Sequence, residues 1–397
     1  MKIAILTSGI LPVPAVQGGA VENLVDFYLD YNDQHSAHDV TVYSIWHPAV
    51  MTHPALKSNV NHYHYIKTTG VLAKFGKRFY RWLHRREEYY HYTIEFFLQQ
   101  ALNHIKKQDY DLIILENRPG YALKIVGKTD ARLVYHLHND ILNNSTNQNQ
   151  TIYKTASRIL VVSDFICSRV HTISSNDIKT QIVYNGIDLS AFSQGKVVSR
   201  DIVGVNPNDF LLEFSGRVTK EKGIMELVEA MGLLTESPNI KLLVIGSSFY
   251  GNSDTKDEFI MMLQKKSEAL ADRVIFTGYI PYDQMSDYLH LADIAVLPSV
   301  WDEPFGLTCV EAMAAGLPVV TTNRGAIPEV VDESCAIMLD TDEHFVNNLA
   351  EAIQYLYENP AKREQMAKAS VQRAKHFDKE TYAANFFDAI ESIDESC

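Results

Sequence analysis

Glu303 and Glu311 stand eight positions apart in the segment EPFGLTCVE, and the residues around them suit an elongated anionic ligand. A predicted strand, Ile294–Leu297, ends shortly before, and a helix should begin near Phe305–Leu307. Gly306 would let the backbone approach a ligand closely, and the free N–H groups of a helix start favour an anion. Glu303 could accept hydrogen bonds from hydroxyl groups, while Glu311, one to two turns inside the helix at about 1.5 Å per residue, would reach another part of the ligand. A diphosphate with a sugar on one side and a ribose on the other fits this arrangement; the alternative is an ordinary helix with Glu311 on a solvated face.

Two cations follow the first strand predicted in the second half of the chain. Arg217 and Lys222 lie in FSGRVTKEKG. A departing nucleoside diphosphate accumulates negative charge, which fixed cations in a closed site stabilise. Arginine can hold phosphate oxygens in a planar fork while lysine acts as a point charge. The alternative is a surface arginine and lysine around a turn.

The first half of the chain offers a histidine and a glycine pair. His138 in YHLHND ends a predicted strand and could bind a sugar hydroxyl. His136 lies on the same face of that strand and remains an alternative. Gly18 and Gly19 precede the first predicted helix, where their backbone could approach phosphates or an acceptor; a flexible turn is the alternative.

The elements that must position these residues are short apolar runs alternating with helical patterns. Most runs are continuously apolar, which is typical of parallel strands covered by helices on both faces. Strands separated by helices predict βαβ units and doubly wound sheets. The predicted strands are Lys2–Leu6, Val40–Ile45, Leu112–Leu115, Leu133–Leu137, Ile159–Val162, Ile182–Tyr184, Phe210–Phe214, Leu242–Ile245, Val274–Phe276, Ile294–Leu297, Val319–Thr321 and Ile337–Leu339.

A polar stretch at Ser190–Arg200 divides these strands into two series and predicts two Rossmann-like domains. We expect an acceptor-side domain at 1–190, a donor-binding domain at 196–375, and a helix at 378–397 that crosses back to the first domain. Ligands of such sheets bind beyond the carboxyl ends of the strands, so the two domains should face each other across a cleft.

Composition excludes several classes of protein. The chain has 397 residues and a formal net charge of −13, which argues against a nucleic-acid-binding protein. We find no run of about 20 apolar residues that could span a bilayer, and the first residues read as a buried strand rather than a signal peptide. The four cysteines show no disulfide or metal spacing, so we expect a cytoplasmic protein.

The segment EPFGLTCVE, followed by AMAAGLPVV, resembles the E-x7-E signature of retaining glycosyltransferases of family 4, which have the GT-B fold. Other landmarks follow in the family's order over nearly the whole chain. They are Gly18-Gly19 with Glu22, VVSDF, VYNGID, FSGRVTKEKG and FTGYIP.

The resemblance implies a reaction that retains the anomeric configuration by front-face attack, with the leaving phosphate accepting the acceptor's proton. It assigns Glu303 to the donor sugar, Glu311 to the ribose, and Arg217 and Lys222 to the donor phosphates, with His138 facing the sugar. The remaining donor-binding residues that it implies are Gly18, Gly19, Tyr279, Ile280, Phe305, Gly306, Leu307 and Thr308.

An Asp-x-Asp pair holding a divalent metal would be a different solution. The two candidates are Asp109 with Asp111 and Asp340 with Asp342, and neither is expected at the carboxyl end of a strand. With two cations and a helix start available, we expect metal-independent transfer without a cofactor.

The segment 74–86, KFGKRFYRWLHRR, is basic and aromatic within an acidic protein. Phe75, Phe79, Trp82 and Arg86 fall at helical spacing, with cations on another side. Such a helix can lie on an anionic membrane, which would bring the protein to the inner face of the cell membrane and a lipid-linked acceptor. The alternative is that the apolar stripe packs on the N-terminal sheet and the cations are solvated or bind a soluble anionic acceptor.

The sequence therefore predicts a glycosyltransferase that moves a hexosyl group from a nucleotide-diphosphate sugar, UDP- or GDP-linked, to a glycan or lipid-linked acceptor. Bacterial surface polysaccharide or lipopolysaccharide synthesis is the expected context by family analogy. The alternatives are another enzyme on the same fold, such as a nucleotide-sugar epimerase or a phosphorylase, and a non-catalytic nucleotide-sugar-binding protein.

Overall fold

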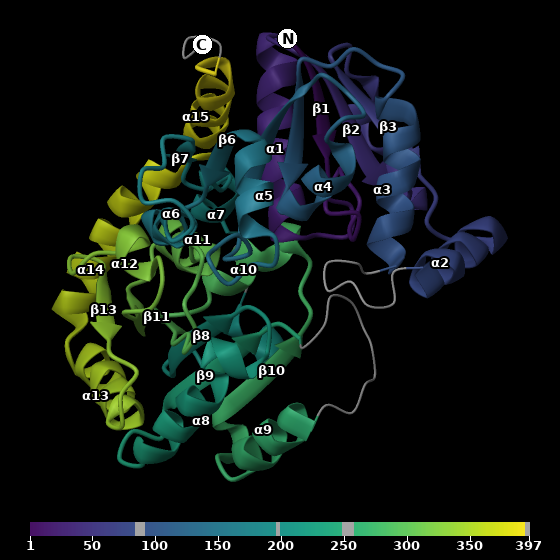
Figure 1. Ribbon diagram of the computed structural model, residues 1–397. Coiled ribbons are helices and arrows are strands. Elements are labelled where there is room, and N and C mark those ends of the chain that lie inside the picture. Colours follow the sequence, from purple (N-terminus) through teal and green to yellow (C-terminus); the bar gives the residue numbers. More distant parts are fainter. Residues whose placement is uncertain (84–91, 196–198, 248–257, 394–397) are drawn as a thin grey trace. The chain divides into compact units, whose positions relative to one another are not determined.

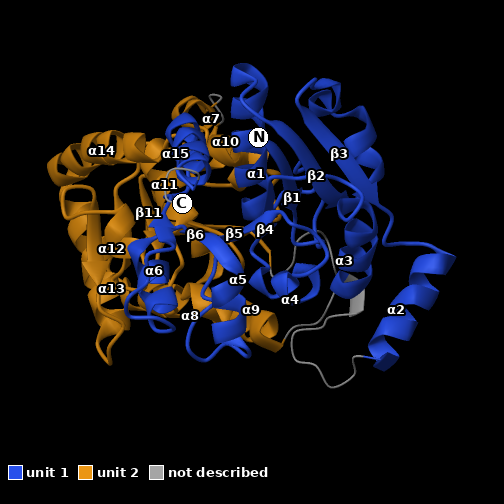
Figure 2. Ribbon diagram, turned by 45° about the horizontal axis from the view of Figure 1, so that its top comes forward, with its two compact units in different colours: residues 1–186, 379–397 blue, residues 187–378 orange. Residues whose placement is uncertain are grey.

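The computed structural model describes residues 1–83, 92–195, 199–247 and 258–393. They form two compact units, each built on one parallel sheet (Figures 1 and 2). Unit 1 comprises Met1–Gly186 and Lys379–Cys397, and unit 2 comprises Ile187–Asp378. The predicted fold class, two Rossmann-like doubly wound domains, is confirmed. The sequence predicts domains at 1–190 and 196–375 with a returning helix at 378–397, and the two units of the structure change over at 186/187 and 378/379. A cleft between them stays a prediction.

Unit 1 contains a seven-stranded sheet in the order β3-β2-β1-β4-β5-β6-β7, with all pairs parallel. The central strands are fully buried because helices cover both faces. The strands are β1 (Lys2–Leu6), β2 (Asp39–Ile45), β3 (Asn61–Ile66), β4 (Leu112–Glu116), β5 (Arg132–Leu137), β6 (Ala156–Val161) and β7 (Thr180–Ile182).

The helices of unit 1 divide between the two faces of its sheet. Figure 2 shows α1 and α15 on one face and α4 and α5 on the other. Tyr28 of α1 stacks on Phe386 of α15 with ring centroids 4.1 Å apart, which joins the end of the chain to its first helix. The helices are α1 (Ala20–His35), α2 (Val71–Leu83), α3 (Tyr92–Ile105), α4 (Ala122–Ile125), α5 (Asn149–Thr155), α6 (Asp164–His171) and α15 (Lys379–Glu391).

Unit 2 contains a six-stranded parallel sheet in the order β10-β9-β8-β11-β12-β13. Its strands are β8 (Phe210–Ser215), β9 (Ile240–Ile245), β10 (Val274–Gly278), β11 (Ile294–Leu297), β12 (Val319–Thr322) and β13 (Ala336–Leu339). Its helices are α7 (Leu189–Ser193), α8 (Ile224–Leu233), α9 (Glu258–Glu268), α10 (Met285–Leu289), α11 (Leu307–Ala314), α12 (Ile327–Val330), α13 (Phe345–Glu358) and α14 (Pro360–Ala374).

Two strand predictions were wrong. The edge strand β3 was not predicted because its sequence, NHYHYI, is polar and aromatic rather than continuously apolar. The strand predicted at Ile182–Tyr184 lies two residues earlier, at Thr180–Ile182, since those residues pair with β6. The other predicted strands coincide with observed ones to within two residues at each end, except that β6 begins at Ala156, three residues before the predicted start at Ile159.

The strand orders locate the expected binding regions. In each doubly wound sheet the order reverses between two central strands, and ligands bind beyond their carboxyl ends. These strands are β1 and β4 in unit 1, and β8 and β11 in unit 2. The ends of these strands and the segments after them carry Gly18–Gly19, Glu116–Arg118, Arg217–Lys222 and Ser299–Glu303.

No helix in the described ranges is long and apolar enough to cross a bilayer. Cys167, Cys309 and Cys335 are buried free thiols, and Cys397 lies outside the described residues.

Candidate functional site

The predicted donor residues Lys222 and Glu303 meet at the carboxyl ends of β8 and β11. Lys222 Nζ donates to Glu303 Oε1 at 2.6 Å, and the hydroxyl of Ser299 donates to the same oxygen at 2.7 Å. Both charged side chains are mostly buried, with 20% of Lys222 and 10% of Glu303 exposed. A buried carboxylate held by two donors keeps a fixed direction, and its second oxygen can accept a further hydrogen bond from a ligand.

A close backbone approach brings the turn that carries Lys222 against the end of β11. Gly223 has φ 70°, and a Cβ at this position would lie 1.8 Å from the carbonyl oxygen of Pro298. Only glycine fits both the left-handed conformation and this contact. A hydrogen bond from Val300 N–H to the carbonyl oxygen of Glu221 at 2.9 Å completes the attachment. Ser299 Oγ, which donates to Glu303, lies 3.1 Å from the same carbonyl oxygen.

Helix α11 begins directly after Glu303 and presents its amino end to the same region. Gly306 is the N-cap with φ 109°, and α11 starts at Leu307. The N–H groups of Leu307 and Thr308 are not bonded to any acceptor in the described chain, so they can bind an anion together with the helix dipole. A small pocket here is lined by Ser215, Lys222, Ser299, Glu303, Gly306, Thr308 and neighbouring apolar residues. Phe305 does not line it; its ring is buried edge-on against Phe377.

Glu311 lies further along α11 and is buried rather than on a solvated face, so the ordinary-helix alternative is wrong for its side chain. Burial raises the pKa of Glu311 to about 7, although the neighbouring Tyr282 hydroxyl favours the ionised carboxylate. Glu213 of β8 lies nearby and is fully buried, with neither carboxylate oxygen hydrogen-bonded within the described ranges. Burial, with a smaller contribution from the charge of Glu311, raises the pKa of Glu213 to about 8. Glu213 and Glu311, two carboxyl groups with raised pKa values, therefore lie close together near the N-terminus of α11.

The remaining predicted donor residues of unit 2 lie at the same edge of its sheet. Arg217 follows β8, is exposed, and makes no hydrogen bond or ion pair with other described side chains. Backbone hydrogen bonds join the ends of β8, β9 and β10: Gly216 N–H donates to Ile245, and Gly246 N–H donates to Gly278. Tyr279, directly after β10, is 42% exposed, and Ile280 is half-buried. These positions suit contacts with a ligand, while their assigned roles stay predictions.

In unit 1, His138 belongs to a buried hydrogen-bonded cluster that sequence reasoning missed. Its centre is Glu116, the last residue of β4, which pairs in register with His136 of β5. His138 Nε2 lies 2.9 Å from Glu116 Oε2, and His136 Nδ1 lies 3.2 Å from each Glu116 oxygen. The hydroxyl of Tyr28 donates to Glu116 Oε1 at 2.9 Å. Both histidines therefore bind one carboxylate, as expected for residues on one face of a strand.

The electrostatics of this cluster favour an ionised Glu116 beside a neutral His138. Burial and the neighbouring His136 lower the pKa of His138 to about 4. Burial opposes ionisation of Glu116, but His136 and His138 together lower its pKa below the usual glutamate range. Of the described residues, only Glu116, His136 and His138 bring together three groups that could ligate a metal ion.

The two Asp-x-Asp candidates, which the sequence does not favour as a metal site, form no such group among the described residues. Asp111 precedes β4 and accepts a hydrogen bond from the backbone of Lys2 at 2.6 Å. Asp342 accepts from the backbone of His344 at 2.9 Å. Asp340 directly follows β13, so the expectation that neither pair touches the carboxyl end of a strand was wrong for this residue, because β13 ends at Leu339.

Gly18 and Gly19 lie immediately before α1, and the helix begins at Ala20. Glu22 in its first turn is buried and lies near both Gly19 and Glu116. Burial raises the pKa of Glu22 to about 7, and the charge of Glu116 adds to this rise. The glycine pair therefore adjoins the Glu116 cluster within unit 1.

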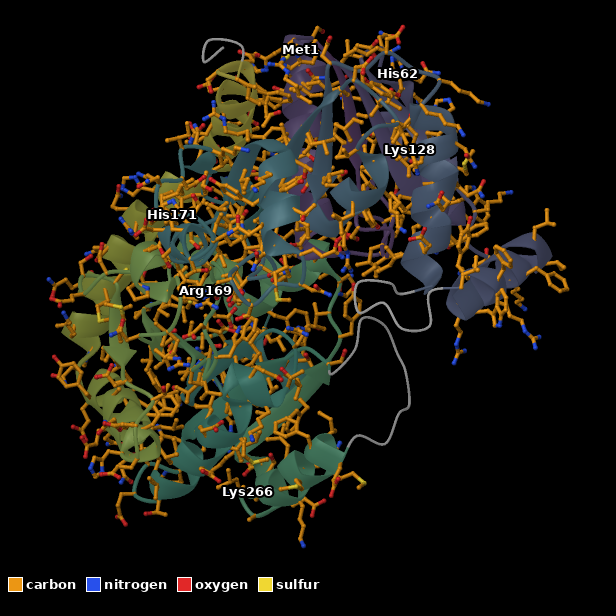
Figure 3. The ribbon with its side chains drawn as sticks, in the orientation of Figure 1. Met1, His62, Lys128, Arg169, His171 and Lys266 are labelled. Carbon is orange, nitrogen blue, oxygen red and sulfur yellow. The ribbon has the colours of Figure 1, made fainter. Side chains whose placement is uncertain are left out.

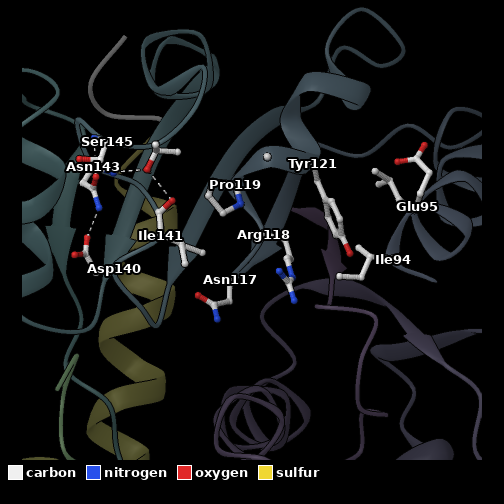
Figure 4. Close-up of a pocket in the computed structure, with 13 residues that line it drawn as sticks. Ile94, Glu95, Asn117, Arg118, Pro119, Tyr121, Asp140, Ile141, Asn143 and Ser145 are labelled. Atoms are coloured by element: carbon white, nitrogen blue, oxygen red, sulfur yellow. Dashed lines mark hydrogen bonds between the residues drawn. The ribbon is translucent and has the colours of Figure 1, made fainter. Parts of the chain in front are cut away.

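A pocket of about 320 Å³ opens next to this cluster, and Figure 4 shows its residues. Asn117 and Arg118, directly after β4, lie between a group around Asp140 and a group around Tyr121 (Figure 4). Arg118 Nε is buried and forms no hydrogen bond with the described residues, whereas Asp140 is occupied by an ion pair with Arg169 at 2.7 Å. The walls are completed by Ile94, Glu95, Leu98, Pro119, Gly120, Ile141, Asn143, Ser145 and Thr146. Amide, guanidinium and aromatic groups together suit a polar ligand with hydroxyls.

Helix α2 carries the described part of the basic aromatic segment. Phe75, Phe79 and Trp82 are 68%, 55% and 72% exposed, so the alternative that they pack on the N-terminal sheet is wrong. The helix instead contacts α3 through small residues, because a Cβ on Gly76 would lie 2.7 Å from the ring of Phe96. The side chains of α2 project outward (Figure 3). Residues 84–86, including Arg86, lie outside the described residues.

Two family models match the chain, one on each half. Residues 34–191 match Glycosyltransferase Family 4, and residues 197–373 match Glycosyl transferases group 1. Spore coat protein SA of Bacillus subtilis is 28% identical over 392 residues, covering 94% of this chain and 95% of that protein. The lipopolysaccharide 1,2-N-acetylglucosaminetransferase of Salmonella typhimurium is 26% identical over 230 residues, covering 57% of this chain and 58% of that protein.

Solved structures share the fold over the full length. Anabaena HepE in complex with UDP-glucose has a TM-score of 0.74 at 21% identity, covering 99% of this chain and 100% of that one. Sucrose-phosphate synthase from Thermosynechococcus elongatus has a TM-score of 0.77 at 20% identity, with both chains fully covered. With a glycosyltransferase family match on each half and this shared fold, the chain is a glycosyltransferase of the GT-B type.

Proposed function

We propose that the chain transfers a hexosyl group, with retention of the anomeric configuration, from a UDP- or GDP-linked sugar to a glycan or lipid-linked acceptor. The observation that carries the donor half of this proposal is the grouping of Lys222, Glu303 and the unbonded N–H groups at the start of α11. A pyrophosphate placed there gains a cation and a helix dipole, and Glu303 can accept from sugar hydroxyls. Glu311, deeper in α11, then binds the ribose.

Transfer is proposed to need no divalent metal, because Lys222, the exposed Arg217 and the α11 N–H groups supply positive charge to the leaving pyrophosphate. Complexes of HepE with UDP and with UDP-glucose support a nucleotide-sugar donor for a chain of this fold.

The pocket beside Asn117 and Arg118 is proposed to take the acceptor. It lies beyond β4 and β5 and offers amide, guanidinium and aromatic groups for hydroxyl recognition. Synthesis of a bacterial surface polysaccharide or lipopolysaccharide is the proposed context, supported by the Salmonella relative.

Helix α2 is proposed to dock the protein on an anionic membrane surface. Its exposed Phe75, Phe79 and Trp82 can enter the interface while Lys74, Lys77 and Arg78 attract anionic lipid. Co-sedimentation with vesicles containing phosphatidylglycerol should be strong at low salt and lost with Phe75→Ser/Trp82→Ser. Equal binding by wild type and variant, or no binding at low salt, would end this part of the proposal.

The test of the activity is a panel of UDP, GDP, ADP and their sugars in a thermal-shift assay, since a ligand of the folded state raises the Tm. The stabilising donor is then incubated with candidate acceptors, and NMR of the product reads the anomeric configuration. Transfer with retention supports the proposal. Epimerisation of the donor without acceptor, phosphate-dependent glycan breakdown, or binding without turnover would each replace it with one of the alternatives.

A further inference from the structure

The hydrogen bonds around Glu116 restrict the protonation state of His138, the histidine that is expected to contact the substrate. Glu116 and His136 are fully buried, and only 4% of the His138 side chain is exposed. A buried carboxylate is stable only when its oxygens accept hydrogen bonds. Tyr28, His136 and His138 supply three donors to Glu116.

An ionised carboxylate accepts hydrogen bonds and donates none, so each ring nitrogen that faces Glu116 must carry a proton. For His138 this nitrogen is Nε2. Because the low pKa of His138 keeps the ring neutral, Nδ1 is left with a lone pair. Nδ1 is buried and forms no hydrogen bond within the described ranges. A buried acceptor without a donor is destabilising, and a ligand hydroxyl that donates to Nδ1 removes this penalty.

The turn after β4 holds the backbone of His138 as well as its ring. Asn117 adopts φ 53°, a left-handed conformation that asparagine tolerates. Its side-chain oxygen accepts from His138 N–H at 3.2 Å, and its own N–H donates to His136 O at 2.8 Å. Asn117 also lines the unit 1 pocket. Two consecutive residues thus orient His138, one through the ring and one through the backbone.

We propose that Glu116 is a positioning residue that fixes the Nε2–H form of His138, so that Nδ1 accepts a hydrogen bond from a hydroxyl of the transferred sugar. This inference rests on the proposed function for the identity of the ligand, but not for the state of the ring. His138 then selects a hydroxyl rather than an anionic group, because a lone pair repels an anion and accepts from a donor.

The state of the ring is measured without substrate. Histidine-selective ¹⁵N labelling and a long-range ¹H–¹⁵N correlation spectrum at pH 7 distinguish a protonated ring nitrogen from one with a lone pair. The His138 signals are assigned by their absence in His138→Gln. We expect a proton on Nε2 and a lone pair on Nδ1, and loss of this single form in Glu116→Gln. A proton on Nδ1, or a doubly protonated ring, would overturn the proposal.

The consequence for transfer is measured with the stabilising donor. Glu116→Gln should lower kcat by about 10- to 100-fold, the loss typical of removing a hydrogen-bond partner that orients a metal-bound histidine. Nucleotide affinity should change less than about two-fold, and Glu116→Asp should recover part of kcat. Tyr135→Phe, which removes a buried hydroxyl of the neighbouring strand β5 that donates to the carbonyl oxygen of Ile152, is the matched control for stability and should keep kcat. A Glu116→Gln enzyme with wild-type kcat would refute the positioning role.

Donor analogues that each lack one sugar hydroxyl test the ligand. One analogue should be transferred about ten-fold more slowly than the parent by wild type, and His138→Ala should not distinguish the two. If wild type and His138→Ala show the same pattern, the hydroxyl contact is wrong. A correct ring state in a protein that transfers no sugar would reject the proposed function while leaving the Glu116 assignment intact. Stoichiometric zinc in the purified protein would instead make the cluster a metal site and overturn the proposal.

Discussion

Glu213 lies fully buried in the middle of the unit 2 sheet, without a hydrogen-bond partner among the described residues, and this makes the stability of the unit depend on pH. The change to make is Glu213→Gln, which keeps the shape of the side chain and removes its titration. Burial raises the pKa of Glu213 to about 8 in the folded chain, whereas an unfolded glutamate titrates near about 4.3.

The direction of the pH dependence follows from the protonation state of Glu213 in the folded and the unfolded chain. Between about pH 5 and pH 8 the folded chain keeps a proton on Glu213 that the unfolded chain releases, so the free energy of unfolding falls as the pH rises. One group contributes about 1.4 kcal/mol per pH unit in this window. The contribution is fully present below the unfolded pKa and is lost above the folded one. For a unit of this size the Tm should fall by about 3–6 °C per pH unit.

The assay compares the Tm of wild type and Glu213→Gln from pH 5 to pH 9. The Tm of the variant minus the Tm of wild type should increase steadily up to about pH 8 and stay constant above it. Glu236→Gln, which changes an exposed glutamate of the same unit, is the control and should follow wild type. Parallel Tm curves for wild type and Glu213→Gln would refute the assignment of a buried, protonated carboxyl group.

Three further predictions follow from the site. Gly223→Ala should lower the free energy of unfolding by more than about 3 kcal/mol, because the new Cβ would clash with the carbonyl oxygen of Pro298. Gly204→Ala, a control with the same φ of 70° but open space around the Cβ, should lower it by about 1–2 kcal/mol. Equal losses for the two variants in urea denaturation would contradict this contact. Glu311→Ala should weaken nucleotide binding in calorimetry by about ten-fold or more, while His138→Ala should reduce transfer more than nucleotide affinity; unchanged affinity in Glu311→Ala would remove its ribose role. Transfer should persist in excess EDTA, and its loss there, restored by added Mg²⁺ or Mn²⁺, would show that a metal is needed.

The fold could be predicted because buried parallel strands are continuously apolar, as in the LIIL run that begins β4. The same reasoning failed at β3, an edge strand whose histidines and tyrosines give no apolar run. The shortest strand of the unit 1 sheet, β7, was misplaced because three residues are too few to show a recognisable apolar run.

The donor half of the site was readable from local sequence, since Glu303, Gly306 and Glu311 lie on one loop and helix. Glu116 and Glu213 were missed because their significance depends on burial and on distant partners. An acid inside or at the end of an apolar strand, as in LIILE and FLLEFS, was the signal that could have identified both.

The central claim is that protein cations and helix N–H groups, without a bound ion, neutralise the donor pyrophosphate. The most direct measurement is a crystal structure of the protein with UDP or GDP, chosen by the thermal-shift panel. We expect the pyrophosphate within hydrogen-bond distance of Lys222 or Arg217 and of the N–H groups of Leu307 and Thr308. A pyrophosphate bound away from these groups, or held through a metal ion, would contradict the account.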